Sequence, residues 1–408
     1  MALRQGVVRA AFWGLCWSLG LVPLHAQSQT PIPSQTLEGA WPLGTVIRIG
    51  APEIVVDAVR QHCETIDIPD APARALRDQH NTVHLFASHY VARALVGASL
   101  DRVQPDCRVR YRSPENPDPA QFQDRNWLSA FYTEDGVHIT ALVHSEYQAR
   151  RFAGQCDTPT QGATCWWNSI TMAESDDGGL HFVVPAAPGN RVATLPYRYE
   201  RQPQQTAYGY HSPSNIVQRD GYFYALINAW PYRAQRYGPC LMRTPNLSDH
   251  AGWRAWDGKD FTLPFADPYR DTIANPAQHV CQPVFAGEVD SLSWHAPSQR
   301  YIATQYTADG RFGPPGLYFS SSADLLHWSQ PLLVVRTDDL LRDEPAGSWS
   351  YIYFSLLDGA SPDRNFTTLS NQFYVYYVRL DRLHPPYARA LVRRPLRWEP
   401  GLSASSSK

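Results

Sequence analysis

The sequence lacks a long basic run, and its 36 Lys and Arg residues nearly balance its 38 Asp and Glu residues, for a net charge of −2. Proteins that bind nucleic acids or anionic membrane surfaces usually carry clustered positive charge. We therefore expect neither to be the main partner of this chain.

The sequence also lacks a CxxC pair and any Cys/His spacing typical of zinc, so no metal site is predicted from it. Apart from Cys16, six cysteines remain, and an even number favours disulfides in an exported protein. Six cysteines allow 15 connectivities. Proximity in the sequence makes Cys156–Cys165 the first choice, followed by Cys63–Cys107 and Cys240–Cys281.

Long apolar runs are absent after the first residues. Arg4 and Arg9 precede the apolar segment 10–24, and His25-Ala26 then offers a cleavage site, as in a secretory signal peptide. The segment is shorter than a membrane-spanning helix needs, although a retained anchor is the alternative. We predict a signal peptide at 1–26, a flexible lead-in at 27–40 and one domain at 41–400. The mature protein is expected to be secreted or periplasmic, without a membrane span.

Helical periodicity is weak throughout, and 57–65 is the only segment predicted to form a short helix. Period-2 runs bounded by Gly, Pro, Asn and Asp dominate instead, which indicates an all-β chain. A turn followed by an aromatic, alternating strand recurs at 134–144, 219–227 and 297–306. Such units cannot bury their faces alone, so they stack around an axis as the blades of a β-propeller, with the ligand site at one end of that axis.

We predict five blades, with six as the alternative. They span 68–112, 124–185, 207–265, 280–335 and 348–380. A strand at 390–398 is expected to close the ring with residues 46–49.

Two turn motifs resemble those of known propellers. Residues 322–328, Ser-Ala-Asp-Leu-Leu-His-Trp, resemble the S-x-D-L-x-x-W motif of the five-bladed arabinanase/xylosidase and invertase-type glycoside hydrolase clans. Residues 175–182 are similar to the Asp box of sialidases. The resemblance implies a carbohydrate-active propeller with carboxylates at the start of its inner strands. It requires no cofactor, although some arabinanase-type relatives hold a calcium ion in the channel.

Asp70 occupies the position that the resemblance implies for a catalytic base, before the inner strand of the first blade. The alternative is an Asp that caps a turn beside Pro. Residues 211–215 contain no acid at the corresponding place in the third blade, whereas Asp290 offers one in the fourth, with Glu288 as the second choice.

Glu146 is the predicted general acid, because it shares a strand face with His144. A buried carboxylate must be paired to be tolerated, so the two side chains together suggest a polar cleft. The alternative is a solvated pair on an edge strand.

Further residues are predicted to bind substrate. Arg74 and Arg243 suit a sugar acid, because Arg can bind a carboxylate with two hydrogen bonds. His89, His144 and Asn215 are the other predicted contacts. We expect an exported, divergent glycoside hydrolase that acts on an oligo- or polysaccharide through a carboxylate acid/base pair. A non-catalytic glycan- or protein-binding propeller is the alternative.

Overall fold

The computed structural model describes residues 45–157, 164–201, 206–344, 348–384 and 388–399. The predicted signal peptide (1–26) and lead-in (27–40) lie outside these residues. The described chain is almost entirely β-structure, with one short α-helix, α1 (Thr337–Arg342). Its 3-10 turns are Pro119–Gln121, Ala149–Arg151, His250–Gly252, Pro276–His279 and Ala296–Ser298. Within the described segments no helix is long and apolar enough to cross a membrane.

Within these residues, the strands form four hydrogen-bonded sheets, and the largest, of ten strands, contains two antiparallel groups joined by one parallel strand pair. With these two groups described separately, there are five groups. The first group contains β3 (Arg74–Arg77), β4 (Val83–Phe86), β5 (Val91–Gly97) and β6 (Gln104–Arg112). The second contains β7 (Arg125–Tyr132), β8 (Ile139–Gln148), β9 (Trp166–Ser175) and β10 (Arg191–Ala193). The third contains β11 (Tyr208–His211), β12 (Val217–Arg219), β13 (Tyr222–Trp230), β14 (Gly238–Thr244), β15 (Arg254–Ala255) and β16 (Leu263–Pro264).

The fourth group contains β17 (Ser291–His295), β18 (Arg300–Thr307), β19 (Gly316–Ser322) and β20 (Leu332–Arg336), and β22 (Thr368–Leu369) pairs with β17 in parallel. The fifth contains β21 (Trp349–Leu357), β23 (Gln372–Asp381) and β24 (Arg389–Glu399) together with β1 (Val46–Ile49) and β2 (Glu53–Asp57).

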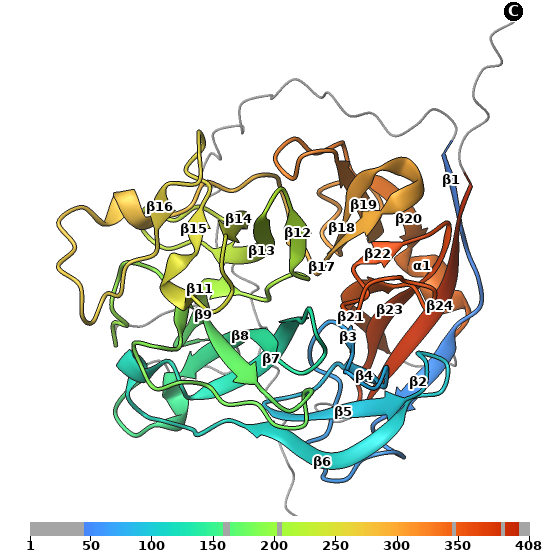
Figure 1. Ribbon diagram of the computed structural model, residues 1–408, viewed down its shortest axis with the longest axis horizontal. Helices are drawn as coiled ribbons and strands as arrows, with labels where there is room; N and C mark the ends of the chain where they lie inside the picture. Colours follow the sequence, from blue (N-terminus) through green and yellow to red (C-terminus); the bar gives the residue numbers. More distant parts are fainter. Residues whose placement is uncertain (1–44, 158–163, 202–205, 345–347, 385–387, 400–408) are drawn as a thin grey trace, which may run out of the picture. The chain divides into compact units, whose positions relative to one another are not determined.

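The five groups surround a common centre, with one strand of each on the inside (Figure 1). The inner strands β3 and β7 are in contact, as are β17 and β21, and β21 and β3. The second and third groups are joined by parallel pairing between β9 and β11. The all-β propeller predicted from the sequence is thereby confirmed.

The ring is closed by strands from both ends of the described chain. Residues of β1 pair with β24 from Val46↔Glu399 to Ile49↔Leu396, and β2 pairs with the same strand. This is the closure expected from 390–398 and 46–49. Because β24 also pairs with β23, the last group depends on residues far apart in the sequence.

Asp-Gly turns connect neighbouring strands at the positions that the repeats indicated. Asp220 and Gly221 both have positive φ, 49° and 77°, between β12 and β13. Two consecutive positive φ angles are typical of the two-residue hairpin turn, which matches the twist of its strands. The predicted helix at 57–65 is wrong: β2 ends at Asp57 and turns follow, held by Asp57 and by the Cys63–Cys107 disulfide.

The resemblance motif at 322–328 forms a closed turn between β19 and β20. Asp324 Oδ1 accepts hydrogen bonds from the backbone of Leu326 and His327, and the ring of His327 contacts Oδ2 at 2.6 Å. Trp328 Nε1 donates to Leu325 O at 2.8 Å. The Asp is fully used by its own turn, so this motif builds the fold and leaves the reaction to other residues.

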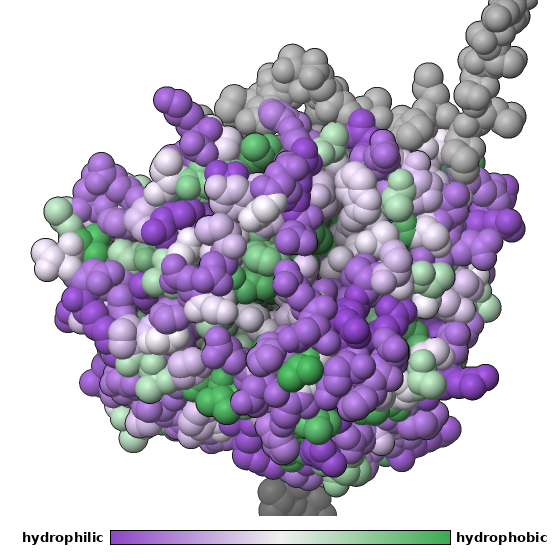
Figure 2. Space-filling model, in the orientation of Figure 1, coloured by the Kyte–Doolittle hydropathy of each residue, from purple (hydrophilic) through white to green (hydrophobic). Residues whose placement is uncertain are grey.

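All three predicted disulfides are present: Cys63–Cys107, Cys156–Cys165 and Cys240–Cys281. The exterior seen in Figure 2 is largely hydrophilic, with apolar side chains in small separate areas. Polar side chains on the buried strands do not reach this exterior, so they need hydrogen-bond partners inside the ring.

Replacing Trp398 tests how much this residue contributes to closing the ring of strands. Its side chain is 3% exposed and its ring lies 4.4 Å from that of His295 on β17, so it joins the last group to the fourth. We expect Trp398→Ala to lower the free energy of unfolding by about 3–5 kcal/mol, measured by denaturant unfolding.

The control is Trp294→Ala, because half-buried Trp294 packs on Tyr301 of its own group at 4.8 Å. A smaller loss is expected for this control. Equal losses in the two variants would contradict the closing role of Trp398.

Candidate active site

Asp70 precedes β3 and is surrounded by groups from three parts of the ring. Its Oδ2 accepts a hydrogen bond from Trp127 Nε1 at 3.2 Å and lies 3.4 Å from His89 Nε2. Its Oδ1 pairs with Arg389 of β24 and accepts from Tyr353 OH at 3.4 Å. The carboxylate therefore connects the first group to the second and the last.

The surroundings of Asp70 act on its pKa in opposite directions. Burial raises the pKa and is the largest effect, while the charge and hydrogen bond of Arg389 lower it. Donation from Trp127 and Tyr353 lowers it further. The pKa of Asp70 is raised overall, because burial outweighs these contacts, although the cation of Arg389 opposes part of the increase.

Glu146 lies near the end of β8, opposite Arg125 of β7. It is 8% exposed, and β8 pairs with strands on both sides, so the solvated edge-strand alternative is wrong. Gln148 Nε2 donates to Glu146 Oε2 at 2.6 Å, and His144 Nε2 lies 3.6 Å from Oε1.

Burial raises the pKa of Glu146 to about 8, and the negative charge of Asp70 adds to the increase. The hydrogen bond from Gln148 acts against it but does not reverse it. Glu146 therefore carries a proton at neutral pH. Two nearby carboxyl groups with different surroundings are a typical arrangement for dividing acid and base roles.

Asp290 lies immediately before β17. Its Oδ2 accepts a hydrogen bond from the backbone of Phe354 at 3.0 Å, and its backbone oxygen accepts from Arg74 Nη2 at 2.6 Å. Burial raises the pKa of Asp290 to about 7; the hydrogen bond from Phe354 opposes this, Glu288 adds to it and Arg74 opposes it.

Tyr353 shows that the three carboxyl groups face one region. After burial, the charges of Asp70, Glu146 and Asp290 all raise its pKa, while Arg389 lowers it. Tyr353 has a positive φ of 62° where the pairing of β21 and β23 shifts register. An L side chain rarely adopts this conformation, so the surrounding structure must hold it in place. The result is a protonated hydroxyl directed at Asp70.

Two uncharged imidazoles lie beside the carboxyl groups. The ring of His144 is 5.9 Å from that of His211, and burial lowers the pKa of each to about 3. His144 Nε2 contacts Asn168 Oδ1 at 3.2 Å, and the ring of His211 packs against that of Trp230 at 4.1 Å with the two planes tilted by 35°. His211 Nε2 has no hydrogen-bond partner and lies 3.8 Å from Glu288 Oε1. His211 thus occupies the third-group position where the sequence offered no acid.

The predicted binding residues divide into two sets. His89 lies beside Asp70, and His144 lies beside Glu146. We call Asp70, Glu146 and Asp290 the carboxyl cluster. Arg74 is 2% exposed and donates to backbone oxygens of Ala73, Pro213 and Asp290. Its hydrogen bonds therefore hold the backbone beside Asp290 in place.

Asn215 and Arg243 are engaged elsewhere. Asn215 Oδ1 accepts from Ser291 Oγ and from the backbone of Leu292, which ties the third group to β17. Arg243 packs over the rings of Tyr222 and Phe261, at 4.2 and 4.3 Å. No described contact of Arg243 reaches the three carboxyl groups.

Sequence analysis did not select Tyr353, Arg389, Trp127, Trp230 or His211. Trp127 and Trp230 could have been found as aromatic residues at strand ends of neighbouring groups. Arg389 and Tyr353 gave no local signal, because they are 319 and 283 residues from Asp70.

Comparison with known proteins gives a fold likeness only. No protein-family model matches the sequence, and no curated protein matches it. Among solved structures, a protein of unknown function from Dyadobacter fermentans has a TM-score of 0.49 at 10% identity, covering 86% of this chain and 99% of that one.

A GH43_1 enzyme from Xanthomonas citri in complex with xylotriose has a TM-score of 0.47 at 14% identity, covering 85% and 90% of the two chains. The catalytic domain of a Coprinopsis cinerea GH62 alpha-L-arabinofuranosidase has a TM-score of 0.46 at 9% identity, covering 85% and 96%. All three scores are below 0.5, so the function proposed below rests on the residues of this chain.

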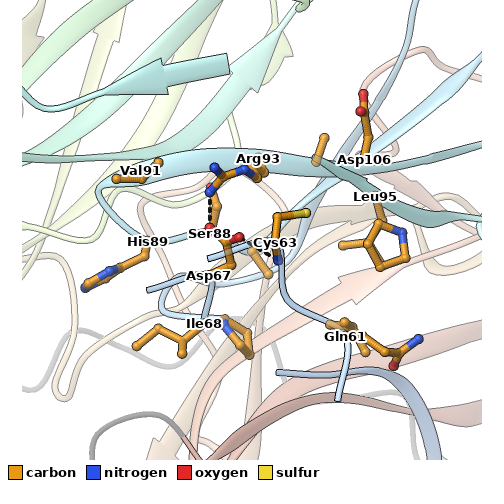
Figure 3. A pocket seen from close by; sticks show the side chains of 15 residues that line it. Gln61, Cys63, Asp67, Ile68, Ser88, His89, Val91, Arg93, Leu95 and Asp106 are labelled. Atoms are coloured by element: carbon orange, nitrogen blue, oxygen red, sulfur yellow. Dashed lines mark hydrogen bonds and ion pairs between the residues drawn. The ribbon is translucent and has the colours of Figure 1, made fainter. Parts of the chain in front are cut away.

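A cavity of about 70 Å³ lies next to the segment that carries Asp70. Its lining includes Pro69 and His89 but is mostly apolar, and Arg93 pairs with Asp67 beside it (Figure 3). The apolar lining suits packing behind the segment better than sugar binding. Within the described residues, no cluster of three or more His, Cys, Asp or Glu is arranged to hold a metal ion.

The raised pKa of Glu146 predicts a pH-dependent stability. The folded protein keeps this proton up to about pH 8, whereas an ordinary Glu loses it near 4.5. Folding stability from this group is therefore present below about 4.5 and is lost as pH rises toward 8. We expect Glu146→Gln to have a Tm close to the wild type at acidic pH and a higher Tm than the wild type at alkaline pH.

Glu115→Gln is the control with the opposite sign. Burial raises the pKa of Glu115, but Arg125 and Arg151 lower it overall, so its contribution appears as pH rises. Thermal unfolding across the pH range checks both variants. A Tm difference for Glu146→Gln that does not change with pH would contradict the buried, protonated state.

Proposed function

We propose that the protein is a glycoside hydrolase whose acid/base pair is Glu146 and Asp70. The observation that carries this proposal is the pair's opposite surroundings in one buried region. Glu146 has no cation in hydrogen-bond contact and holds its proton to about pH 8, whereas Asp70 contacts Arg389. Glycosidic bond cleavage needs one protonated and one ionised carboxyl group, on either side of the bond.

In this mechanism Glu146 donates its proton to the glycosidic oxygen as the bond to the leaving group breaks. Asp70 either removes a proton from the attacking water or attacks the sugar itself. A separation of about 6.5–9.5 Å between the carboxyl groups gives inversion, and about 5–5.5 Å gives retention. Asp290, whose charge also acts on Tyr353, stabilises the positive charge that develops on the sugar ring.

The uncharged groups of the cluster suit a sugar. His144 and His211 are neutral, so each imidazole can both donate and accept hydrogen bonds with hydroxyl groups. The free Nε2 of His211 supplies one such contact. Trp127 and Trp230 supply flat apolar faces beside these polar groups, which is typical of ligand sites.

We further propose that the protein is secreted or periplasmic and that its substrate is an oligo- or polysaccharide. The three disulfides support export, because such bonds persist in oxidising compartments. A second candidate is a non-catalytic glycan-binding propeller. It is favoured by the donors to Asp70 from Arg389, Trp127 and Tyr353, which leave little room for an attacking water.

Glu146→Gln separates the two candidates. The amide keeps the size of the side chain but cannot donate an acidic proton. We expect kcat/KM to fall by about 100-fold or more, measured on a panel of 4-nitrophenyl pentosides, hexosides and furanosides and on soluble polysaccharides.

The matched control is Glu174→Gln, an exposed carboxylate on the adjacent strand β9, which should keep full activity. Equal turnover by Glu146→Gln would remove Glu146 from the reaction. Binding of glycans without turnover by the wild type would support the non-catalytic candidate.

The pH–rate profile follows from the same pair. Glu146 must be protonated, so kcat/KM should decline as pH rises through about 8. Asp70 must be ionised, so kcat/KM should decline again on the acidic side. Because the carboxyl groups interact, the two limbs report apparent pKa values of the group. A rate that stays constant well above pH 8 would rule out Glu146 as the acid.

A further inference from the structure

A second concave region adjoins the carboxyl cluster on the side of the fourth group. It has a volume of about 260 Å³ and is lined by Tyr237, Gly287, Glu288, Tyr306, Thr307, Ala308, Asp309, Arg311 and Phe312. We call these residues the side groove. A cavity of this size and mixed polarity accommodates a small polar ligand.

Glu288 links the side groove to the cluster. Its carboxyl group lines the groove, accepts a hydrogen bond from Trp230 Nε1 at 2.8 Å and lies 3.8 Å from His211 Nε2. Its charge also raises the pKa of Asp290, the next acid along the chain. A chain of sugars lying across His211 would therefore reach the groove next.

The groove has an aromatic wall whose position depends on a glycine. Gly287 has a φ of 84°, and a Cβ at this position would lie 2.8 Å from the ring of Phe312 and 2.7 Å from Gln305 Nε2. Only glycine leaves Phe312 its place against the backbone. Phe312 also meets Tyr318 edge-on at 5.6 Å, and Tyr237 OH accepts from Arg311 on another side of the groove.

The charges of the groove disfavour an acidic ligand. Arg311 Nε contacts both carboxylate oxygens of Asp309, at 3.0 and 2.9 Å, so its charge is largely neutralised within the wall. Among the described residues, Glu288 has no Lys or Arg in direct contact, and burial raises its pKa. A uronic acid would place a negative charge beside this uncompensated acid, whereas a neutral sugar would find hydrogen-bonding groups and a ring to stack on.

We infer that the side groove binds a second, uncharged sugar residue next to the one that is cleaved. This inference rests on the proposed glycosidase function and gives its substrate class: neutral chains in which at least one further sugar is bound next to the one that is cleaved. The protein should then hydrolyse a trisaccharide more efficiently than the aryl glycoside of the same sugar.

The test compares two substrates in the wild type and three variants. The substrates are the 4-nitrophenyl glycoside that the wild type cleaves fastest and the trisaccharide of the same sugar and linkage. We expect Phe312→Ala to lower kcat/KM for the trisaccharide by about tenfold, the usual size for loss of one aromatic contact, and to leave the aryl glycoside within about twofold.

Phe261→Ala is the matched control, because Phe261 is an equally half-buried ring packed against Trp256 and outside the groove. It should leave the ratio between the two substrates unchanged. Gly287→Ala provides a second probe, since displacing Phe312 should reproduce the trisaccharide defect.

The outcomes separate this inference from the proposed function. If Phe312→Ala lowers kcat/KM equally for both substrates, or for neither, the side groove is not a sugar site although the enzyme is a glycosidase. If the wild type cleaves no substrate of the panel, the proposed function itself fails.

Calorimetric binding gives a readout without turnover. Glu146→Gln should bind the neutral trisaccharide, and the double variant with Phe312→Ala should bind it about tenfold more weakly. A trisaccharide that ends in a uronic acid should bind more weakly than the neutral one to the protein with an intact groove. Tighter binding of the acidic trisaccharide would overturn the charge argument.

Discussion

The ion pair between Asp70 and Arg389 joins the closure of the fold to its chemistry. Arg389 is the first residue of β24, the strand that receives β1 and β2, and Asp70 precedes the first inner strand. Both side chains are about 15% exposed, at 14% for Asp70 and 15% for Arg389. Removing one partner of such a pair leaves an uncompensated charge and typically costs several kcal/mol. The ring must therefore be closed before Asp70 acquires the cation that opposes the effect of burial on its pKa.

This pair also makes the surroundings of Asp70 different from those of Glu146. Glu146 retains its proton, because burial and the charges of Asp70 and Asp124 outweigh the hydrogen bond from Gln148 and the charge of Arg125. Asp70 is the acid with the cation. The hydroxyl of Tyr353 donates to Asp70, and its positive φ is rare in β-strands, so the region combines buried acids with a strained backbone. Features of this kind are concentrated at functional sites because the rest of the fold must stabilise them.

The sequence predicted most of the fold for local reasons. Period-2 patterning, Asp-Gly turns and the spacing of six cysteines are short-range signals, and the strand groups, the closing strand and the three disulfides follow them. The predicted helix at 57–65 is wrong, because the Cys63–Cys107 disulfide holds this segment in turns.

The site was predictable only in part. Polar residues on otherwise buried strands pointed to Glu146 and His144, and the resemblance to known propellers pointed to Asp70. Arg389 and Tyr353 could not be found, because closure of the ring brings them to Asp70 from the far end of the chain. At the third inner strand the resemblance implies an acid, whereas the structure places the imidazole of His211 there. Arg243 has the right chemistry, but its register on β14 directs it to Tyr222 and Phe261.

The most direct test of coupled, buried carboxyl groups is a carbon-13 NMR titration of the Glu146 carboxyl in the wild type and in Asp70→Asn. The wild type should titrate at a pKa of about 8, and the variant at a lower pKa, because the charge of Asp70 no longer opposes ionisation of Glu146. Titration near 4.5 in both proteins, the value of an ordinary Glu, would show that the two groups do not share a buried site and would contradict the account.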